Sequence, residues 1–403
     1  MYTDVVSFQS MVSEETLSEL ICDLVSIPSY PGIPGQESGV AEYIHSYFST
    51  AGIDAELVAI VDGRTNIYAK LHGKGKGRTL VLNGHTDTVP PYDMIDALLP
   101  RKEGREIIGR GASDMKGPLA CMMLAMRLIK EADIQLAGDL VFTGVIDEEL
   151  TSLGTRAFLR SGLKADGAIV GEPTNLEVCI GHKGLQWFQF DIHGKAVHGG
   201  EQDRGVNAIR SASLLIQRIE KELIPKITSR KHPLIGASSL NYGLIKGGFQ
   251  PSTVPGECVF QIDRRWIPGE DYDDVEHELL VLVESLKRED PSFETDFRVM
   301  DKSIMETGII HEGFVIDPEH PLVKEAQRAV LDYNGHEAVT GPFKAWTDGG
   351  LLSRYGGIPT IVFGPGNLST AHTKHECINI DQALRSVLIY ISIILGFCGV
   401  VES

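Results

Sequence analysis

The stretch TLVLNGHTD, residues 79–87, joins a run of apolar, strand-forming residues to a histidine and an aspartate. The run is almost continuously apolar, as in a strand of a parallel sheet that is covered on both faces. His85 and Asp87 stand two residues apart, so in an extended chain their side chains point to the same side. Open α/β sheets bind ligands beyond the carboxyl ends of such strands. The stretch therefore predicts an α/β fold with a ligand site where this strand ends.

The alternation of strands and helices continues on both sides of this stretch. Apolar runs at 139–146 and 167–171 predict further strands, and amphipathic patterns from Glu14 and at 38–51 and 117–132 predict helices. Alternating elements of this kind indicate a mostly parallel central sheet with helices on both faces.

The pattern changes after His182. Residues 184–196 alternate apolar with polar side chains like a half-exposed antiparallel strand, and a helix at 205–223 and a strand at 256–266 follow. A helix at 274–288 and a strand at 294–299 complete an α+β unit of βαββαβ type. The first pattern returns near His311. We therefore expect an α/β domain made of residues 1–182 and 311–403, interrupted by a smaller α+β domain at 183–310.

Composition narrows the classes of partner and compartment. The 403 residues include 37 basic and 55 acidic side chains, a formal charge of −18 that repels nucleic acids and anionic membrane surfaces. Six cysteines form no CxxC pair, which favours reduced thiols and a cytoplasmic setting.

The N-terminus lacks the basic and apolar regions of a signal peptide. The apolar run 386–401 predicts a core helix, with a lipid anchor as the alternative.

Four more motifs place titratable side chains where a predicted strand ends or a helix begins. They are Asp114 in GRGASDMKG (109–117), Glu148 and Glu149 beside Asp147 in FTGVIDEELTSLG (142–154), Glu172 in IVGEP (169–173), and His372, His375 and Glu376 in FGPGNLSTAHTKHECI (363–378).

Each motif also has a purely structural interpretation. These are a hydrogen-bonded histidine at a strand end for His85, a helix N-cap for Asp114, a helix start for the three acids and a turn for Glu172. Parallel strands, however, end on the same edge of a sheet, so the side chains are expected to meet there. The expected set is a group of nitrogen and oxygen donors without thiolates: His85, Asp114, Glu149, Glu172 and His372. Such donors suit divalent ions such as Zn²⁺, Co²⁺ or Mn²⁺, and two ions would have to share one carboxylate.

The order HTDTVP, GRGASDMKG, DEE, GEPT and AHTKHE resembles the M20 family of dinuclear zinc amidohydrolases. Within that family it is similar to the acetylornithine deacetylase and succinyl-diaminopimelate desuccinylase group, from about Glu14 to the C-terminus. The resemblance implies a zinc-aminopeptidase-like catalytic domain that carries a ferredoxin-like lid domain, and a homodimer formed through that lid. It also implies that Asp114 bridges two ions, with His85 and Glu172 on one, Glu149 and His372 on the other, Asp87 orienting His85, and Glu148 acting as general base.

Two residues of the inserted domain match the family pattern. His198 corresponds to the lid histidine that supports the oxyanion of the tetrahedral intermediate, and a plain loop histidine is the alternative. Arg265, in the DxR pattern with Asp263, would grip a substrate carboxylate, and a salt bridge at a strand edge is the alternative. The sequence departs from the family pattern at the following positions near the substrate: Gly199, Gly200, Ser252 and His375.

These observations predict a hydrolase that uses two divalent ions, with Zn²⁺ preferred, to remove an acetyl, succinyl or formyl group from the nitrogen of an amino acid or a similar small amine. A metal-bridging hydroxide would attack the amide, and Glu148 would carry the proton. Glu172, where peptidase branches of the family often have aspartate, favours a deacylase. A dipeptidase or carboxypeptidase with the same metal centre is the alternative. An inactive binding protein would have lost ligands, and a serine hydrolase would need the GxSxG motif that is absent.

Overall fold

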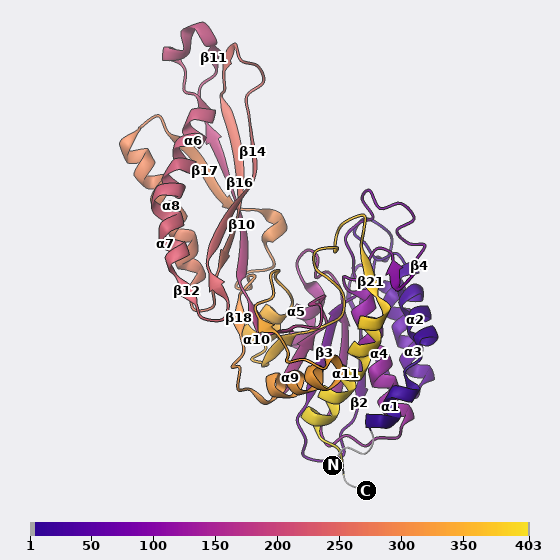
Figure 1. The fold of residues 1–403 in the computed structure, drawn as a ribbon. Coiled ribbons are helices and arrows are strands. Elements are labelled where there is room, and N and C mark those ends of the chain that lie inside the picture. The colour runs from indigo at the N-terminus through magenta and orange to yellow at the C-terminus, as the bar shows by residue number, and fades with distance from the viewer. Residues whose placement is uncertain (1–4, 402–403) are drawn as a thin grey trace. The chain divides into compact units, whose positions relative to one another are not determined.

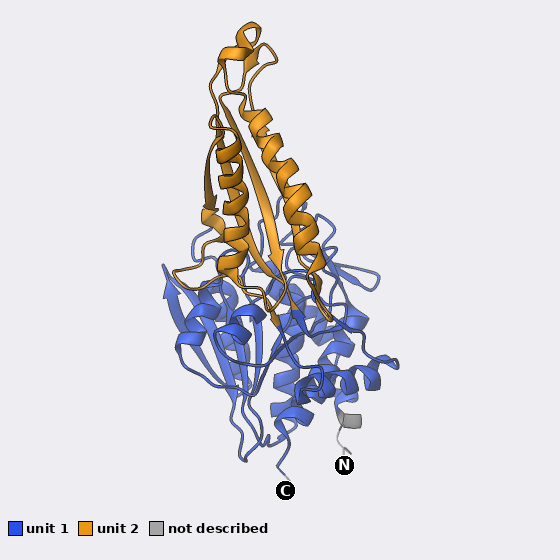
Figure 2. Cartoon of the chain, turned by 90° about the vertical axis from the view of Figure 1, so that its left-hand side faces the viewer, with its two compact units in different colours: residues 1–181, 315–403 blue, residues 182–314 orange. Residues whose placement is uncertain are grey.

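The structure, a computed structural model, describes residues 5–401, and its chain divides into two compact units (Figure 2). Unit 1 consists of residues 1–181 and 315–403, and unit 2 of residues 182–314. The chain passes between the units at the short strands β9 (Gly181–His182) and β18 (Phe314–Val315). The N-terminal segment in which the sequence predicts no signal peptide begins with residues 1–4, and these lie outside the described part.

Unit 1 is built on a mixed sheet of eight strands (Figure 1). In spatial order the strands are β1 (Asp54–Val61), β2 (Arg64–Leu71), β6 (Leu140–Val145), β3 (Leu80–His85), β7 (Gly167–Val170), β20 (Thr360–Val362), β8 (Val178–Cys179) and β19 (Thr340–Gly341). The central strands β6, β3, β7 and β20 run parallel, whereas at one edge β2 pairs antiparallel with both β6 and β1. The predicted mostly parallel sheet is thus confirmed, and every residue of β3 is buried.

Helices cover both faces of this sheet. Phe48 of α3 packs against Phe142 on one face, whereas Phe158 of α5 packs against Tyr68 on the other. The first face also carries α4 and α11, which contact β3, and α10 contacts β7 and β20. The helices of unit 1 are α1 (Val5–Met11), α2 (Glu14–Ser26), α3 (Ser38–Thr50), α4 (Lys116–Glu131), α5 (Leu153–Arg160), α9 (Pro321–Asn334), α10 (Gly349–Arg354) and α11 (Ile380–Cys398).

The C-terminal helix α11 is long and apolar enough, by length and composition alone, to cross a membrane. Within the described residues it is the one helix that passes this test, and 72% of its most apolar window is buried inside the fold. It packs against α4 and α9 in the main hydrophobic core. The helix has 19 residues, so the short apolar run seen in the sequence underestimated its length. Its burial fits the core helix predicted from the sequence.

Unit 2 contains an antiparallel sheet with helices packed on it (Figure 1). Its strands, in spatial order, are β14 (Ser239–Gly247), β16 (Glu257–Trp266), β10 (Gly184–His193) and β17 (Glu294–Val299). The helices α6 (Ala208–Arg218), α7 (Ile224–Ser229) and α8 (Tyr272–Glu289) complete it, so the order along the chain is β10, α6, β14, β16, α8, β17. Phe190 and Phe260 stack in the core of this unit. Strand β14 is an edge strand.

The remaining strands are short. In unit 1, β4 (Arg101–Glu103), β5 (Glu106–Ile108) and β21 (Cys377–Asn379) form a small antiparallel sheet. In unit 2, β11 (Val197–His198) pairs with β15 (Thr253–Val254), and β12 (Lys231–His232) pairs with β13 (Gly236–Ala237).

Candidate metal centre

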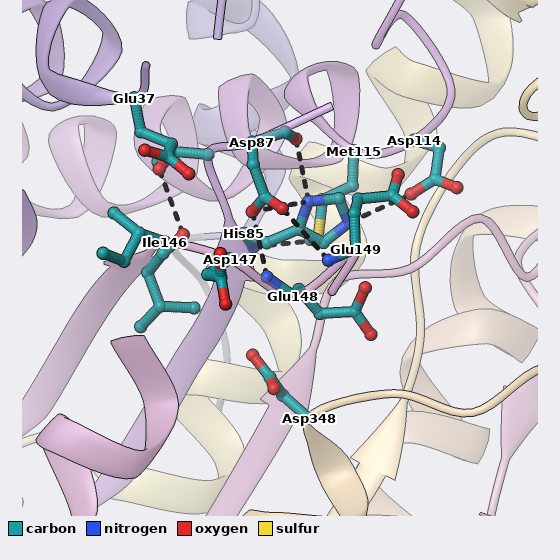
Figure 3. Close-up of polar contacts among 12 residues, drawn as sticks. Glu37, His85, Asp87, Asp114, Met115, Ile146, Asp147, Glu148, Glu149 and Asp348 are labelled. Carbon is teal, nitrogen blue, oxygen red and sulfur yellow. Dashed lines mark hydrogen bonds and ion pairs between the residues drawn. The ribbon is translucent and has the colours of Figure 1, made fainter. Parts of the chain in front are cut away.

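The predicted ligands of unit 1 come from five separate segments of the chain, and Figure 3 shows three of them, His85, Asp114 and Glu149. His85 is the last residue of β3, and Glu149 lies in the turn that follows β6. Glu172 comes two residues after the end of β7, and Asp114 precedes α4. His372 lies in the loop after β20 and has a positive φ of 62°. The carboxyl ends of the parallel strands and two loops therefore supply the site.

Asp114 lies between the two histidines. Its Oδ1 is 3.1 Å from Nε2 of His85, and its Oδ2 is 3.2 Å from Nε2 of His372. Nε2 of His372 is also 2.9 Å from Oε1 of Glu149, and Nε2 of His85 is 3.8 Å from Oε1 of Glu172. The structure thus brings all five predicted ligands into one cluster in which Asp114 faces both halves.

Two sets of donor atoms in this cluster are compact enough to hold a cation. His85, Glu148 and Glu172 form one set and His85, Asp114 and Glu149 the other, with the donor atoms of each set within 4.8 Å of one another. The resemblance implied a different grouping, in which Glu148 is no ligand. Glu148 is therefore placed to act either as the general base or as a metal ligand, and a variant can separate the two roles.

Asp87 supports the site in a way that differs in detail from the expected one. Nδ1 of His85 lies 2.9 Å from the backbone oxygen of Asp87 and 3.5 Å from its carboxylate. The carboxylate instead accepts the backbone N–H groups of Glu148 at 3.2 Å and of Glu149 at 3.0 Å. The main chain of Asp87 thus orients His85, while its side chain holds the turn that carries the two glutamates.

The charges of the cluster are unbalanced. Burial, together with neighbouring carboxylates, raises the pKa of Glu148 and of Glu172 well above the usual range. Burial alone would lower the pKa of His372, but Asp114 and Glu149 raise it to about 10. Among the described residues, no lysine or arginine forms an ion pair with Glu148 or Glu172.

Divalent cations fit this donor set. Four carboxylates face two imidazoles in a partly buried space, and cations would relieve the repulsion that raises the pKa of the glutamates. The donors are nitrogen and oxygen atoms without thiolates, as ions of the Zn²⁺, Co²⁺ and Mn²⁺ class accept. The residues present are therefore suited to the two ions expected from the sequence.

A further buried carboxylate next to the cluster was not predicted. Asp348, which directly precedes α10, lies near Glu148 in Figure 3 and is 1% exposed. Its Oδ2 accepts a hydrogen bond from Thr155 at 2.6 Å, and burial raises its pKa to about 6. The aspartate precedes a pair of glycines in the sequence, but it follows no predicted strand, so the strand-end argument could not select it.

Asp147, the first of the three adjacent acids, turns away from its neighbours. Its Oδ1 is 2.8 Å from Nη2 of Arg64, which also pairs with Glu37, and its Oδ2 accepts the hydroxyl of Thr151 at 2.6 Å. Arg64 thus balances the charge of Asp147, whereas Glu148 and Glu149 face the cluster.

The two remaining predicted site residues lie in unit 2. His198 is exposed, and its Nδ1 accepts the backbone N–H of Gly200 at 3.2 Å. Arg265 lies on β16, and its guanidinium bonds to both carboxylate oxygens of Asp263 at 3.0–3.2 Å. The salt bridge considered as the alternative for Arg265 is therefore present.

A partly buried cluster of histidines and carboxylates at the carboxyl edge of an α/β sheet defines a metal-dependent hydrolase. The chain belongs to peptidase family M20/M25/M40, whose profile matches residues 81–396. This confirms the resemblance drawn from the five motifs, and the family is metal-dependent.

Named relatives extend over almost the whole chain. An N-formyl-4-amino-5-aminomethyl-2-methylpyrimidine deformylase from Bacillus subtilis is 28% identical over 99% of both chains. An acetylornithine deacetylase from Myxococcus xanthus is 30% identical over 95% of this chain and 97% of its own. Among solved structures, a tripeptidase from Staphylococcus aureus is similar with a TM-score of 0.78 and 22% identity, covering 95% of this chain and 99% of its own. At that identity the structural likeness shows the fold alone.

Proposed function

We propose that the protein is a dinuclear metal-dependent amidohydrolase that removes a formyl, acetyl or succinyl group from the nitrogen of an amino acid or a similar small amine. The observation that carries the proposal is the cluster in which Asp114 contacts His85 and His372 beside three buried or half-buried glutamates. The named deformylase and deacetylase relatives, matched along nearly their full length, support acyl-group removal.

The protein's own side chains divide into holding and proton-transfer roles. His85, Asp114, Glu149, Glu172 and His372 would hold two divalent ions. When bound, such ions lower the pKa of water and polarise an amide carbonyl. Glu148 accepts the proton of the attacking water and passes it to the leaving nitrogen. The Asp87 carboxylate keeps the backbone of Glu148 in place for this transfer.

We assign substrate-binding roles to His198 and Arg265 of unit 2, as the family resemblance implies. His198 would donate a hydrogen bond to the oxyanion of the tetrahedral intermediate. Arg265 would bind a substrate carboxylate with its planar guanidinium, exchanging part of its present pairing with Asp263. Either variant, His198→Ala or Arg265→Met, should lower the catalytic rate or substrate affinity while leaving the metal content unchanged.

A homodimer through unit 2 is part of the same proposal. Strand β14 is a sheet edge with unpaired backbone groups, and such edges readily pair with another chain. Its residues Leu244 and Ile245 are exposed, and Phe249, just after the strand, is fully exposed. Sedimentation should show a dimer for the wild type and a monomer for Ile245→Lys, because a buried lysine at the interface would lack a partner.

A substrate panel tests the proposed activity. The purified protein, loaded with Zn²⁺ or Co²⁺ and checked for two ions per chain, is assayed on N-formyl, N-acetyl and N-succinyl amino acids, on an N-formylaminomethylpyrimidine, and on dipeptides. Turnover of acylated amines is the expected result. Hydrolysis of dipeptides alone would establish the alternative, a dipeptidase or carboxypeptidase with the same metal centre.

A further inference from the structure

Glu376 follows the predicted ligand His372 by four residues but takes no part in the cluster of ligands. Its side chain is completely buried and reaches the loop 109–115 that carries Asp114. The segment of His372 and the loop of Asp114 are separated by more than 250 residues in the sequence, so this contact links two distant parts of the site.

One oxygen of Glu376 collects three backbone donors of that loop. Its Oε1 accepts the N–H groups of Gly111 at 3.0 Å, Ser113 at 3.1 Å and Asp114 at 3.0 Å. The loop must curl tightly for three donors to converge. Gly111 allows this, because it has a φ of +85° and a side chain there would meet Thr88 at 2.9 Å.

The other oxygen, Oε2, forms an ion pair with the buried Arg110. The guanidinium of Arg110 also donates to the backbone oxygens of Pro90 at 3.3 Å, Pro91 at 3.4 Å and Thr373 at 3.4 Å. Arg110 therefore ties the segment after β3 and the segment of His372 to the same carboxylate. A carboxylate suits this place, because each of its two oxygens faces only hydrogen-bond donors.

We propose that Glu376 is a positioning residue that fixes Asp114 relative to His372 and thereby sets the affinity of the site for its two ions. The inference rests on the proposed function, since it takes the cluster to hold metal ions. Residues that support metal ligands typically change metal affinity by about 10–100-fold when they are replaced.

Two variants test the positioning role. In Glu376→Gln, an amide nitrogen would face either the three backbone N–H groups or the guanidinium of Arg110, so one set of donors loses its acceptor. In Glu376→Asp, the charge and a partner for Arg110 are kept, but the carboxylate is one methylene shorter and cannot reach both sides. The aspartate variant thus separates positioning from charge balance, and it also serves if the glutamine variant does not fold.

Glu270 of unit 2 provides a matched control. Its carboxylate, on a side chain that is 9% exposed, likewise accepts a backbone N–H, from Ile267 at 3.0 Å, and pairs with an arginine, Arg230, at 2.6 Å. Glu270→Gln therefore removes the same kind of interaction without touching the segments that carry the ligands.

The readouts are the affinity of the full chain for Zn²⁺, measured by competition with a chelator, and the visible absorption of the Co²⁺-loaded protein, both without substrate. We expect both Glu376 variants to bind Zn²⁺ about 10–100-fold more weakly and to shift the Co²⁺ spectrum, and Glu270→Gln to match the wild type. Wild-type affinity and spectrum in a folded Glu376→Asp would overturn the inference. Failure of the wild type itself to bind two ions would instead overturn the proposed function.

Discussion

The carboxylate of Asp87 accepts the backbone N–H of Glu149 at 3.0 Å, which fastens the end of β3 to the turn after β6. The same carboxylate accepts the N–H of Glu148 at 3.2 Å. Asp87 also accepts a hydrogen bond from His85 through its backbone oxygen. One aspartate thus sets the distance between His85 and the turn that supplies two glutamates to the site.

Replacement of Asp87 by asparagine should therefore reduce activity without unfolding the protein. Asparagine offers one oxygen where two N–H groups are bound, so one donor of the turn loses its acceptor. We expect kcat/KM or metal affinity to fall about 10–100-fold. The control is Asp139→Asn, the same change at a carboxylate that lies away from the cluster, accepts the backbone N–H of Gly73 and pairs with Lys70. Equal activity of the two variants would contradict this role.

Glu148→Ala should abolish turnover while the metal stays bound. General acid–base groups typically contribute about 10²–10⁴-fold to rate, and a base that is no ligand leaves the ions in place when it is removed. The measurement is kcat together with metal content by elemental analysis. A loss of one ion per chain in Glu148→Ala would show that Glu148 is a ligand of the set it forms with His85 and Glu172.

The sequence motifs were sufficient to predict that the residues at the strand ends lie close together. His85 and Glu172 each follow a run of apolar residues, and parallel strands leave little choice about where such residues lie. The mostly parallel sheet followed from the same runs. Local patterns of this kind are visible because they depend on a few neighbouring residues.

Contacts made by long-range packing left no such trace. Asp348 lies near Glu148 at the start of a short helix, and Glu376 reaches the loop of Asp114 through three backbone N–H groups. Backbone donors carry no residue-specific signal. The detail that Asp87 supports His85 through its main chain was hidden for the same reason.

His372→Ala should lower metal occupancy from two ions per chain toward one. The imidazole contacts both Asp114 and Glu149, and no other histidine within the described residues reaches that half of the cluster except His85. We expect the weaker site to lose more than about tenfold in affinity. His375→Ala is the control, because His375 lies three residues on, is exposed and contacts none of the predicted ligands through its ring. Elemental analysis after dialysis measures the number of ions per chain. An unchanged number in His372→Ala would exclude His372 as a ligand.

Acid should destabilise unit 2 through Glu270. Burial alone would raise the pKa of this carboxyl, but hydrogen bonds from Ser238, Arg230 and the Ile267 N–H together lower it from the ordinary value of 4.5. A lowered pKa in the folded state means that ionised Glu270 stabilises the fold above the pKa of the unfolded chain. This contribution is lost as the pH falls below about 4.5 and through the folded-state pKa.

Urea unfolding followed by tryptophan fluorescence measures this effect, because Trp187 and Trp266 both lie in unit 2. At pH 7, Glu270→Gln should cost about 1.5–3 kcal/mol, the usual value of a hydrogen bond to a charged group. The free energy of unfolding of this variant should also change less with pH between 5 and 3 than that of the wild type. The difference corresponds to the uptake of about one proton by Glu270. The control is Glu289→Gln. Glu289 lies at the end of α8 and is an exposed ion-pair partner of Arg218, so its replacement should change stability much less, since exposed ion pairs contribute little. A wild-type pH dependence in Glu270→Gln would show that other carboxyl groups cause the acid sensitivity.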